Sequence, residues 1–156
     1  MRASNNAKML IKSFEGLKLK AYTCPAGALT IGYGHTGGVR EGQTITLQQA
    51  EDLLDDDLRE YARVLEQILN ASEVHINQNQ FDALIDFVYN LGTGNLLKST
   101  LLRLLQENAP DAEVAAEFKK WNKARVNGKL TELPGLTRRR EAEKNLYLTP
   151  VYMSDC

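Results

Sequence analysis

The chain has 156 residues, 43% hydrophobic and 25% charged, with a formal net charge of −1. These values are those of one soluble globular domain. No apolar run approaches the ~20 residues that a bilayer-spanning helix needs, and the first ten residues, MRASNNAKML, lack the apolar segment of a signal peptide. If the protein acts outside a cytoplasm, something else must release it; an N-terminal export anchor is either absent or trimmed from this sequence.

The charge is segregated along the chain. Residues 41–60 hold seven acidic residues and one basic residue, whereas residues 119–144 hold nine Lys or Arg and three Glu. Two solvated faces are the favoured interpretation, and a basic half suited to an anionic polymer is the alternative. Cysteines occur only at positions 24 and 156, which is too few for a disulfide framework. With two histidines and no close ligand spacing, we expect no metal site.

The first predicted helix spans residues 5–15. Its apolar side chains recur at the spacing of one helical face: Ala7, Leu10, Ile11 and Phe14. Glu15 would end this helix, where the helix dipole disfavours a negative charge. We therefore expect Glu15 to be drawn toward its protonated form.

Glycine and proline interrupt residues 16–45 and remove the helical period. Short strand-like pieces at 28–33 and 43–46 predict a two- or three-stranded antiparallel sheet. Helical spacing returns at Thr46, which with Gln49 forms a predicted capping box. The helix that follows would run to about residue 70 and measure ~37 Å, enough to bridge two lobes.

A second cap, Asn77 with Gln80, predicts a buried helix over 78–91 that ends at Gly92. Further helices are predicted at 95–107, 111–121 and 137–147, with a loop at 122–136. The expected fold class is α+β, in one domain over residues 1–156. A β lobe at about 16–60 would be joined by the long helix to a helical lobe. That lobe would comprise about 70–150 and the N-terminal helix.

Two kinds of catalysis compete within residues 15–36. Glu15 has apolar sequence neighbours, and an apolar environment raises the pKa of a carboxyl group toward that of a general acid. A solvated charge is the simpler interpretation of one glutamate. Cys24 with His35 suggests a thiol–imidazole pair instead, but no third orienting group is evident. We favour a loop cysteine and a hydrogen-bonded histidine over that pair.

Thr30 lies in the predicted strand Leu29-Thr30-Ile31-Gly32-Tyr33. Strand alternation places Thr30, Gly32 and Gly34 on one nearly bare face. A ligand can lie close to such a face, and the Thr30 hydroxyl can hold a water molecule there. The residues by themselves thus suggest a cleft with one acid and one hydroxyl.

Residues 15–36 together resemble the signature of phage-type lysozymes, glycoside hydrolase family 24. Two downstream stretches are also similar to this family: Gln80-Phe81-Asp82-Ala83-Leu84 with Asn90-Leu91-Gly92, and Gly135-Leu136-Thr137-Arg138-Arg139-Arg140 with Glu143 and Leu146-Tyr147. The signature itself is carried by Glu15, Gly16, Leu19, Ala21, Tyr22, Cys24, Gly27, Thr30, Ile31, Gly32, Tyr33, Gly34, His35 and Thr36. The resemblance covers residues ~8–148 and implies the two-lobed lysozyme-like fold.

The resemblance implies an endolysin that hydrolyses the β-1,4 bond between N-acetylmuramic acid and N-acetylglucosamine in peptidoglycan. Glu15 would be the general acid, and Thr30 would place water or sugar. Cys24 stands where many members of the family have aspartate, and its role as thiolate, water holder or bystander stays open. The implied partner is the glycan strand. We expect a monomer without cofactor or nucleic acid, held in the host cytoplasm until a membrane pore releases it to the wall.

Five further residues are weaker candidates for substrate contacts: His35, Gln80, Asn90, Asn95 and Arg139. The three amides are equally typical of helix caps or surface positions. Arg138–Arg140 form either a solvated helix face or a cationic group that pairs with Glu15 or Cys24. Trp121, three residues after Phe118, is predicted to lie in the core.

Two other hypotheses remain at this stage. The chain could be a wall-binding module without catalysis, and a Cys24–Cys156 disulfide could block the cleft until it is reduced.

Overall fold

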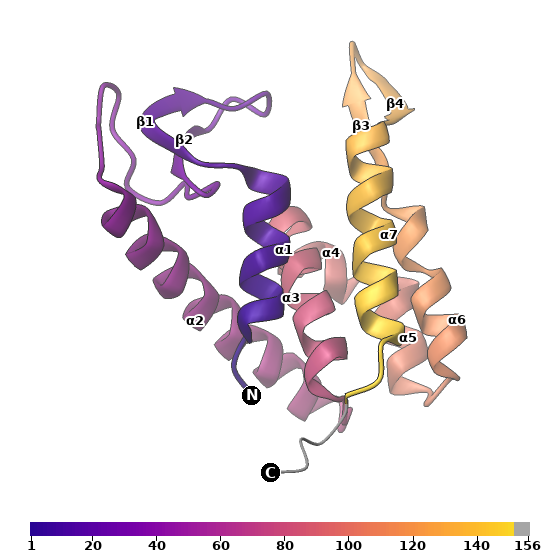
Figure 1. The fold of residues 1–156 in the computed structure, drawn as a ribbon. Helices are drawn as coiled ribbons and strands as arrows, with labels where there is room; N and C mark the ends of the chain where they lie inside the picture. The colour runs from indigo at the N-terminus through magenta and orange to yellow at the C-terminus, as the bar shows by residue number, and fades with distance from the viewer. Residues whose placement is uncertain (152–156) are drawn as a thin grey trace.

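The computed structural model describes residues 1–151. Its helices and strands are arranged as two lobes joined by one long helix (Figure 1). In chain order they are α1 (Asn5–Glu15), β1 (Lys18–Thr23), β2 (Leu29–Gly32), α2 (Leu47–Ala71), α3 (Gln78–Leu91), α4 (Thr93–Leu97), α5 (Thr100–Gln106), α6 (Asp111–Ala116), a 3-10 turn (Phe118–Lys120), β3 (Lys123–Val126), β4 (Lys129–Glu132) and α7 (Pro134–Leu148).

The β lobe is built on one antiparallel pair, β1 with β2, which sets Tyr22 opposite Thr30. A register shift between Lys18 and Tyr22 bends β1. The strand expected at 43–46 is reduced to one isolated bridge between Lys20 and Thr44. The sheet is therefore two-stranded, and its first strand follows directly on α1.

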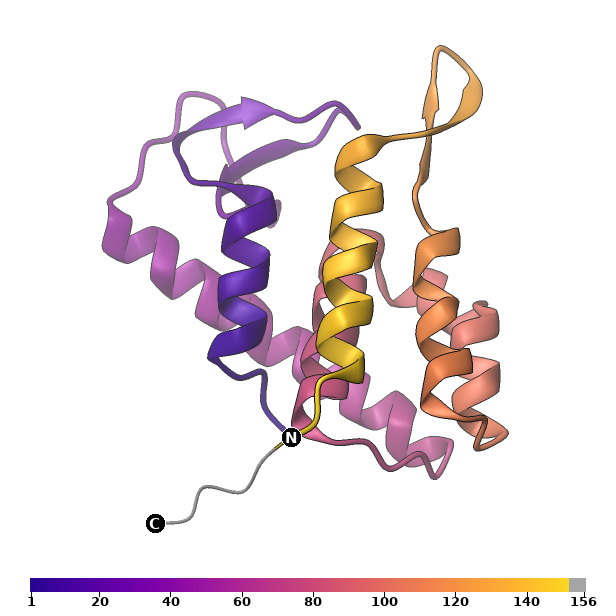
Figure 2. The same cartoon turned by 45° about the vertical axis from the view of Figure 1, so that its right-hand side comes forward.

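Helix α2 leaves the β lobe and crosses the molecule behind α1 (Figures 1 and 2). Both hydrogen bonds of the predicted Thr46–Gln49 capping box are present. Six side chains at three- and four-residue spacing bury one face of α2: Ala50, Leu54, Leu58, Ala62, Leu65 and Leu69. This apolar stripe explains why so long a helix is stable in water.

Helix α3 lies at the centre of the helical lobe. Its residues 79–88 are all buried, and it packs against α1, α2 and α7. The side chain of Asp82 on α3 binds both the backbone N–H and the hydroxyl of Ser4, the N-cap of α1. At the other end of α3, the Tyr89 hydroxyl donates to the carbonyl of Tyr33, 2.5 Å away, in the β lobe. Helix α3 thus connects α1 to the β lobe.

Two predicted helices are shorter or divided. The one expected at 95–107 is split into α4 and α5, because the Ser99 hydroxyl accepts from the Leu102 N–H and begins a new helix. The one expected at 111–121 ends at Ala116 and continues as a 3-10 turn. Helix α7 begins earlier than expected, at Pro134, since proline is well suited to a first helical position.

The prediction of a loop at 122–136 was wrong. Strands β3 and β4 pair in full register across the turn Asn127-Gly128, where both residues have positive φ, 52° and 80°. Such a turn matches the twist of paired strands. Strands β3 and β4 were not predicted because they are four residues long and mostly exposed. They therefore show no alternation of apolar and polar residues.

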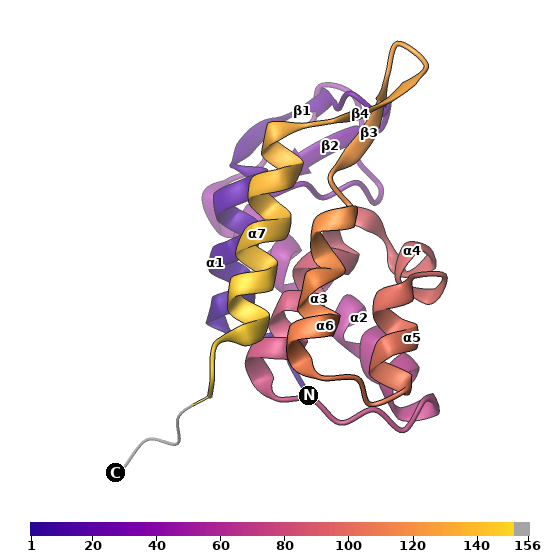
Figure 3. The ribbon, with the colours of Figure 1, turned by 90° about the vertical axis from the view of Figure 1, so that its right-hand side faces the viewer.

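The β1–β2 and β3–β4 hairpins project from the same end of the molecule, away from the N-terminus (Figures 1 and 3). Within residues 1–151, none of the helices combines the length and the apolar character needed to cross a membrane.

Candidate active site

Glu15 is held by an arginine from the far end of the sequence. Helix α1 ends at Glu15 because Gly16, with φ of 68°, leaves helical geometry. From α7, Arg139 Nη1 donates to Glu15 Oε1 at 2.7 Å. The same guanidinium donates through Nε and Nη2 to both oxygens of Asp86 on α3, at 2.9 and 2.8 Å. Of the three cationic candidates for pairing with Glu15, the structure thus selects Arg139.

This arginine is fixed and charged. Its side chain is 5% exposed and that of Asp86 is fully buried, whereas the Glu15 side chain keeps 20% of its surface in solvent. Burial by itself would lower the pKa of Arg139, but the hydrogen bonds and charges of Asp86 and Glu15 outweigh it and raise that pKa. The result is a permanent cation beside a carboxylate that solvent can reach.

Gly34 closes the other side of the Glu15 carboxylate. A Cβ atom at position 34 would stand 2.5 Å from Glu15 Oε2, and the φ of Gly34 is 81°. Only glycine fits both the contact and the backbone conformation. Oxygen Oε1 therefore faces Arg139, and Oε2 faces the bare backbone that strand alternation predicted.

Cys24 and Thr30 lie next to each other across the β1–β2 turn. The Thr30 hydroxyl donates to the Ala28 carbonyl at 3.1 Å. The pKa of the Cys24 thiol is lowered, chiefly by the polar backbone of Ala28 and then by the Thr30 side chain, which stabilise the thiolate. Cys24 is a partly exposed free thiol, while Cys156, its proposed disulfide partner, lies outside the described residues.

Tyr22 on β1 is related both to Thr30 and to the charges of Glu15 and Cys24. It pairs with Thr30 across the sheet. Burial raises the pKa of its phenol, and so do the negative charges of Glu15 and Cys24. Tyr22, which sequence reasoning named only as part of the signature, is thus paired with Thr30 and influenced by the charges of Glu15 and Cys24.

A second buried carboxyl group supports Asp86. Glu143 on α7 is fully buried, and it receives Arg140 Nη2 at 2.8 Å. Burial, and then the neighbouring Asp86, raise the pKa of Glu143 well above its ordinary value. Burial would also raise the pKa of Asp86, but hydrogen bonds from Glu143 and Arg139 hold it below its usual range. The opposite directions of these two pKa shifts assign the proton to Glu143 rather than to Asp86.

Charge counting agrees with that assignment. Two arginines, Arg139 and Arg140, face three carboxyl groups in this network, Glu15, Asp86 and Glu143. With Glu143 neutral the network has no net charge, whereas an ionised Glu143 would leave one uncompensated negative charge in the interior. Uncompensated buried charge is strongly unfavourable.

The other candidates are engaged within the protein. His35 Nδ1 lies 2.7 Å from Asp57 Oδ2 and its Nε2 lies 2.7 Å from the Gly37 carbonyl. The three amides also have partners. Gln80 completes the cap at Asn77, Asn90 accepts from Arg140, and Asn95 donates to the Leu91 carbonyl. Their roles in sugar binding stay predictions.

Trp121 packs at the edge of the core with its ring 5.5 Å from that of Phe87. Sequence reasoning overlooked Asp86 and the network function of Glu143. The available signal was an aspartate among the apolar residues 83–88 of a helix predicted to be buried, because a buried carboxylate requires a cation or hydrogen-bond donors.

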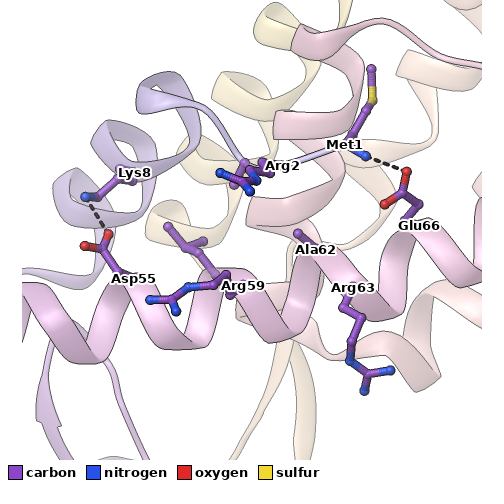
Figure 4. A pocket seen from close by; sticks show the side chains of 10 residues that line it. Met1, Arg2, Lys8, Asp55, Arg59, Ala62, Arg63 and Glu66 are labelled. Atoms are coloured by element: carbon purple, nitrogen blue, oxygen red, sulfur yellow. Dashed lines mark hydrogen bonds and ion pairs between the residues drawn. The ribbon is translucent and has the colours of Figure 1, made fainter.

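One cavity of about 670 Å³ lies elsewhere, between the N-terminus, α1 and α2 (Figure 4). Ion pairs bridge it, among them Lys8 with Asp55 at 2.6 Å. None of the predicted site residues lines it.

The chain is similar to known proteins along nearly its whole length. The model of the family described as phage lysozyme matches residues 12–143. An endolysin of Acyrthosiphon pisum secondary endosymbiont phage 1 is 46% identical over 148 residues, which cover 94% of this chain and 98% of that protein. The endolysin of Salmonella phage P22 is 38% identical over 155 residues, with 96% and 99% covered.

A solved structure is also similar to this chain. The endolysin from Escherichia coli O157:H7 phage FAHEc1 superposes with a TM-score of 0.86 at 35% identity, covering 99% of this chain and 98% of that one. This chain therefore belongs to the phage lysozyme family. The resemblance seen in the sequence is confirmed, and the chain is an enzyme, a hydrolase of peptidoglycan.

Substituting Gly34 tests the packing around Glu15. In Gly34→Ala the new methyl group displaces the carboxylate from Arg139, and we expect the release of reducing ends from peptidoglycan to fall by about 100-fold, since a misplacement of ~1 Å can cost that much. Gly38→Ala is the matched control, because Gly38 also has positive φ, 66°, but nothing within 4 Å. Equal losses in both variants would attribute the effect to backbone strain instead.

The proton on Glu143 is tested by stability at two pH values. The unfolded chain loses this proton near the ordinary pKa of 4.5, while the folded chain keeps it to higher pH. The folded state thus binds more protons in that window, and its stability falls as pH rises. Glu143→Gln does not titrate, so relative to wild type it gains stability between pH 4.5 and 7.5 in urea unfolding.

The exposed neighbour Glu141→Gln is the control and should show no such gain. If Glu143 were instead an ionised partner of Arg140, Glu143→Gln would cost about 3–5 kcal/mol at neutral pH and less at pH 4.5. That opposite trend would contradict the assignment.

Proposed function

We propose that this protein is an endolysin that cleaves the β-1,4 bond between N-acetylmuramic acid and N-acetylglucosamine, with Glu15 as the general acid. The observation that carries the proposal is the position of Glu15. Its carboxylate is fixed by Arg139, backed by Gly34 and still open to solvent. A general acid needs such placement beside the leaving oxygen.

The two carboxylate oxygens of Glu15 have different tasks in this mechanism. Arg139 binds Oε1 and keeps its own position through Asp86. Oxygen Oε2 lies beside the Gly34 backbone and, among the described residues, takes part in no hydrogen bond. It is therefore the oxygen that carries the proton to the glycosidic oxygen. After transfer, the new carboxylate is stabilised by Arg139 without rearrangement, which is the advantage of a preorganised charge.

Cys24 and Thr30 act on the other face of the sugar. A lowered pKa makes the thiolate more available at neutral pH. A thiolate can stabilise the oxocarbenium-like charge of the transition state or take a proton from the attacking water. The Thr30 hydroxyl, close to the sulfur, positions that water.

The release of the enzyme to the wall belongs to the same proposal. The protein acts in host lysis, and it stays in the host cytoplasm until a pore made by another protein gives it access to the wall. Binding is to glycan strands, by a monomer.

Two rival functions have less support. The thiol–imidazole pair requires His35 at Cys24, but both imidazole nitrogens face Asp57 and Gly37 instead. A wall-binding module without catalysis would not need the Glu15 carboxylate to be fixed by Arg139 on one side and by Gly34 on the other.

Glu15→Gln tests the general acid directly. An amide oxygen still accepts from Arg139, so the fold is retained, but no acidic proton is available. We expect the release of reducing ends to fall by about 10³-fold, with an unchanged circular dichroism spectrum. Exposed Glu41→Gln is the control. Near-normal clearing of peptidoglycan by Glu15→Gln would refute the assignment, and a wild-type protein that binds wall material but never cleaves it would favour the binding module.

Cys24 is tested across pH in the same assay. Cys24→Ser should lose about 10–100-fold in rate, and Cys24→Asp should retain activity because aspartate is ionised at neutral pH. Wild-type activity should rise with pH through the lowered thiol pKa, and that rise should be absent in Cys24→Asp. A Cys24→Ser enzyme with the rate and pH profile of wild type would show that the thiol has no role.

A further inference from the structure

The β3–β4 hairpin extends from the helical lobe beyond the start of α7 (Figures 1 and 3). Its strands pair through all four residues, yet none of their side chains belongs to the buried core. Leu130 is 62% exposed and Val126 is 42% exposed. An isolated two-stranded hairpin is marginally stable, so this one contributes little to the stability of the fold.

The hairpin is cationic and its cations are unpaired. Strands β3 and β4 contain three basic residues, Lys123, Arg125 and Lys129, and one acidic residue, Glu132. Among residues 1–151, no carboxylate forms an ion pair with any of these three cations. The register sets Lys123 opposite Glu132 and Arg125 opposite Leu130, so these four side chains share one face. Lys129 lies on the other face, opposite Val126.

The hairpin also lies close to Glu15. Helix α7 begins at Pro134, two residues after β4, and reaches Arg139 five residues later, a rise of ~7.5 Å. Arg139 contacts Glu15 at 2.7 Å. On the other side, β1 begins three residues after Glu15 and carries exposed Lys18 and Lys20. Cationic hairpins therefore flank the proposed catalytic carboxylate on both lobes, at one end of the molecule.

We propose that the β3–β4 hairpin binds the free carboxylates of the peptide stems that N-acetylmuramic acid residues carry, while the glycan lies at Glu15. The proposal rests on the muramidase function above. The sugars of the strand are uncharged there, and the negative charge resides on the peptides. Lys123 and Arg125 on one face of the hairpin, and Lys129 on the other, supply the opposite charge. Leu130, beside Arg125, offers an apolar contact for peptide side chains.

Anionic lipid head groups share this chemistry but fit the geometry less well. A flat lipid surface that touched both hairpins would cover Glu15 between them and exclude the glycan. Peptide stems are attached to the strand that Glu15 cleaves, so they can reach the hairpin while the sugar occupies the site. The binding would be electrostatic and weaken with salt.

The test uses soluble glycan strands that bear their peptides, and the same strands after enzymatic removal of the peptides. The variant is Lys123→Gln/Arg125→Gln/Lys129→Gln, which keeps side-chain length and removes three positive charges. At low salt we expect its KM for peptide-bearing strands to rise about fivefold to tenfold at unchanged kcat, because each exposed charge contributes modestly. Its KM for peptide-free strands should equal that of wild type, and high salt should abolish the difference.

The matched control is Arg59→Gln/Arg63→Gln/Lys98→Gln, which removes the same charge from exposed positions on α2 and after α4. Equal effects of both triples, or equal effects on both substrates, would overturn the proposal, as would an unchanged KM. Hairpin-dependent binding to phosphatidylglycerol vesicles with an unchanged KM would assign the surface to lipid instead. A wild-type enzyme inactive on both substrates would reject the muramidase function itself.

Discussion

The hydrogen bonds of Arg139 to Glu15 and Asp86 join three parts of the chain that are far apart in sequence. Glu15 ends the first helix, Asp86 lies in the central helix and Arg139 lies in the last one. A guanidinium has a planar set of donors and can satisfy two carboxylates at once. Because Asp86 is fully buried, it cannot exchange Arg139 for water, and the arginine must stay where Glu15 needs it.

That constraint accounts for much of the surrounding polar chemistry. Two arginines side by side on α7 would place excess positive charge next to α3, and Asp86 alone does not balance it. Glu15 supplies the second negative charge from the solvent side, and a protonated Glu143 accepts from Arg140 without adding charge. The buried network and the solvent-accessible acid are thus one electrostatic system, so substitutions in α3 or α7 should be felt at Glu15.

Helices that begin with a capping box and carry an apolar face could be predicted from the sequence. Both predicted capping boxes are present, at Thr46 and at Asn77, because each depends on residues three apart and on nothing distant. The β3–β4 hairpin could not be found this way, since its exposed strands lack periodicity. For the site, spacing and family resemblance singled out Glu15, Cys24 and Thr30. The partner of Glu15 lies 124 residues away, and only the folded chain could single out Arg139 among three consecutive arginines.

The end of α1 has a consequence for how this protein can vary in length. Successive residues of an α-helix are rotated by about 100°, and Ser4 fixes the start of α1 through Asp82. One residue inserted or deleted between Ser4 and Glu15 would therefore turn the carboxylate away from Arg139, even if every side chain still packed. The turn at Asn127-Gly128 has no such anchor. Over evolution, insertions and deletions should accumulate in that turn and be nearly absent from α1.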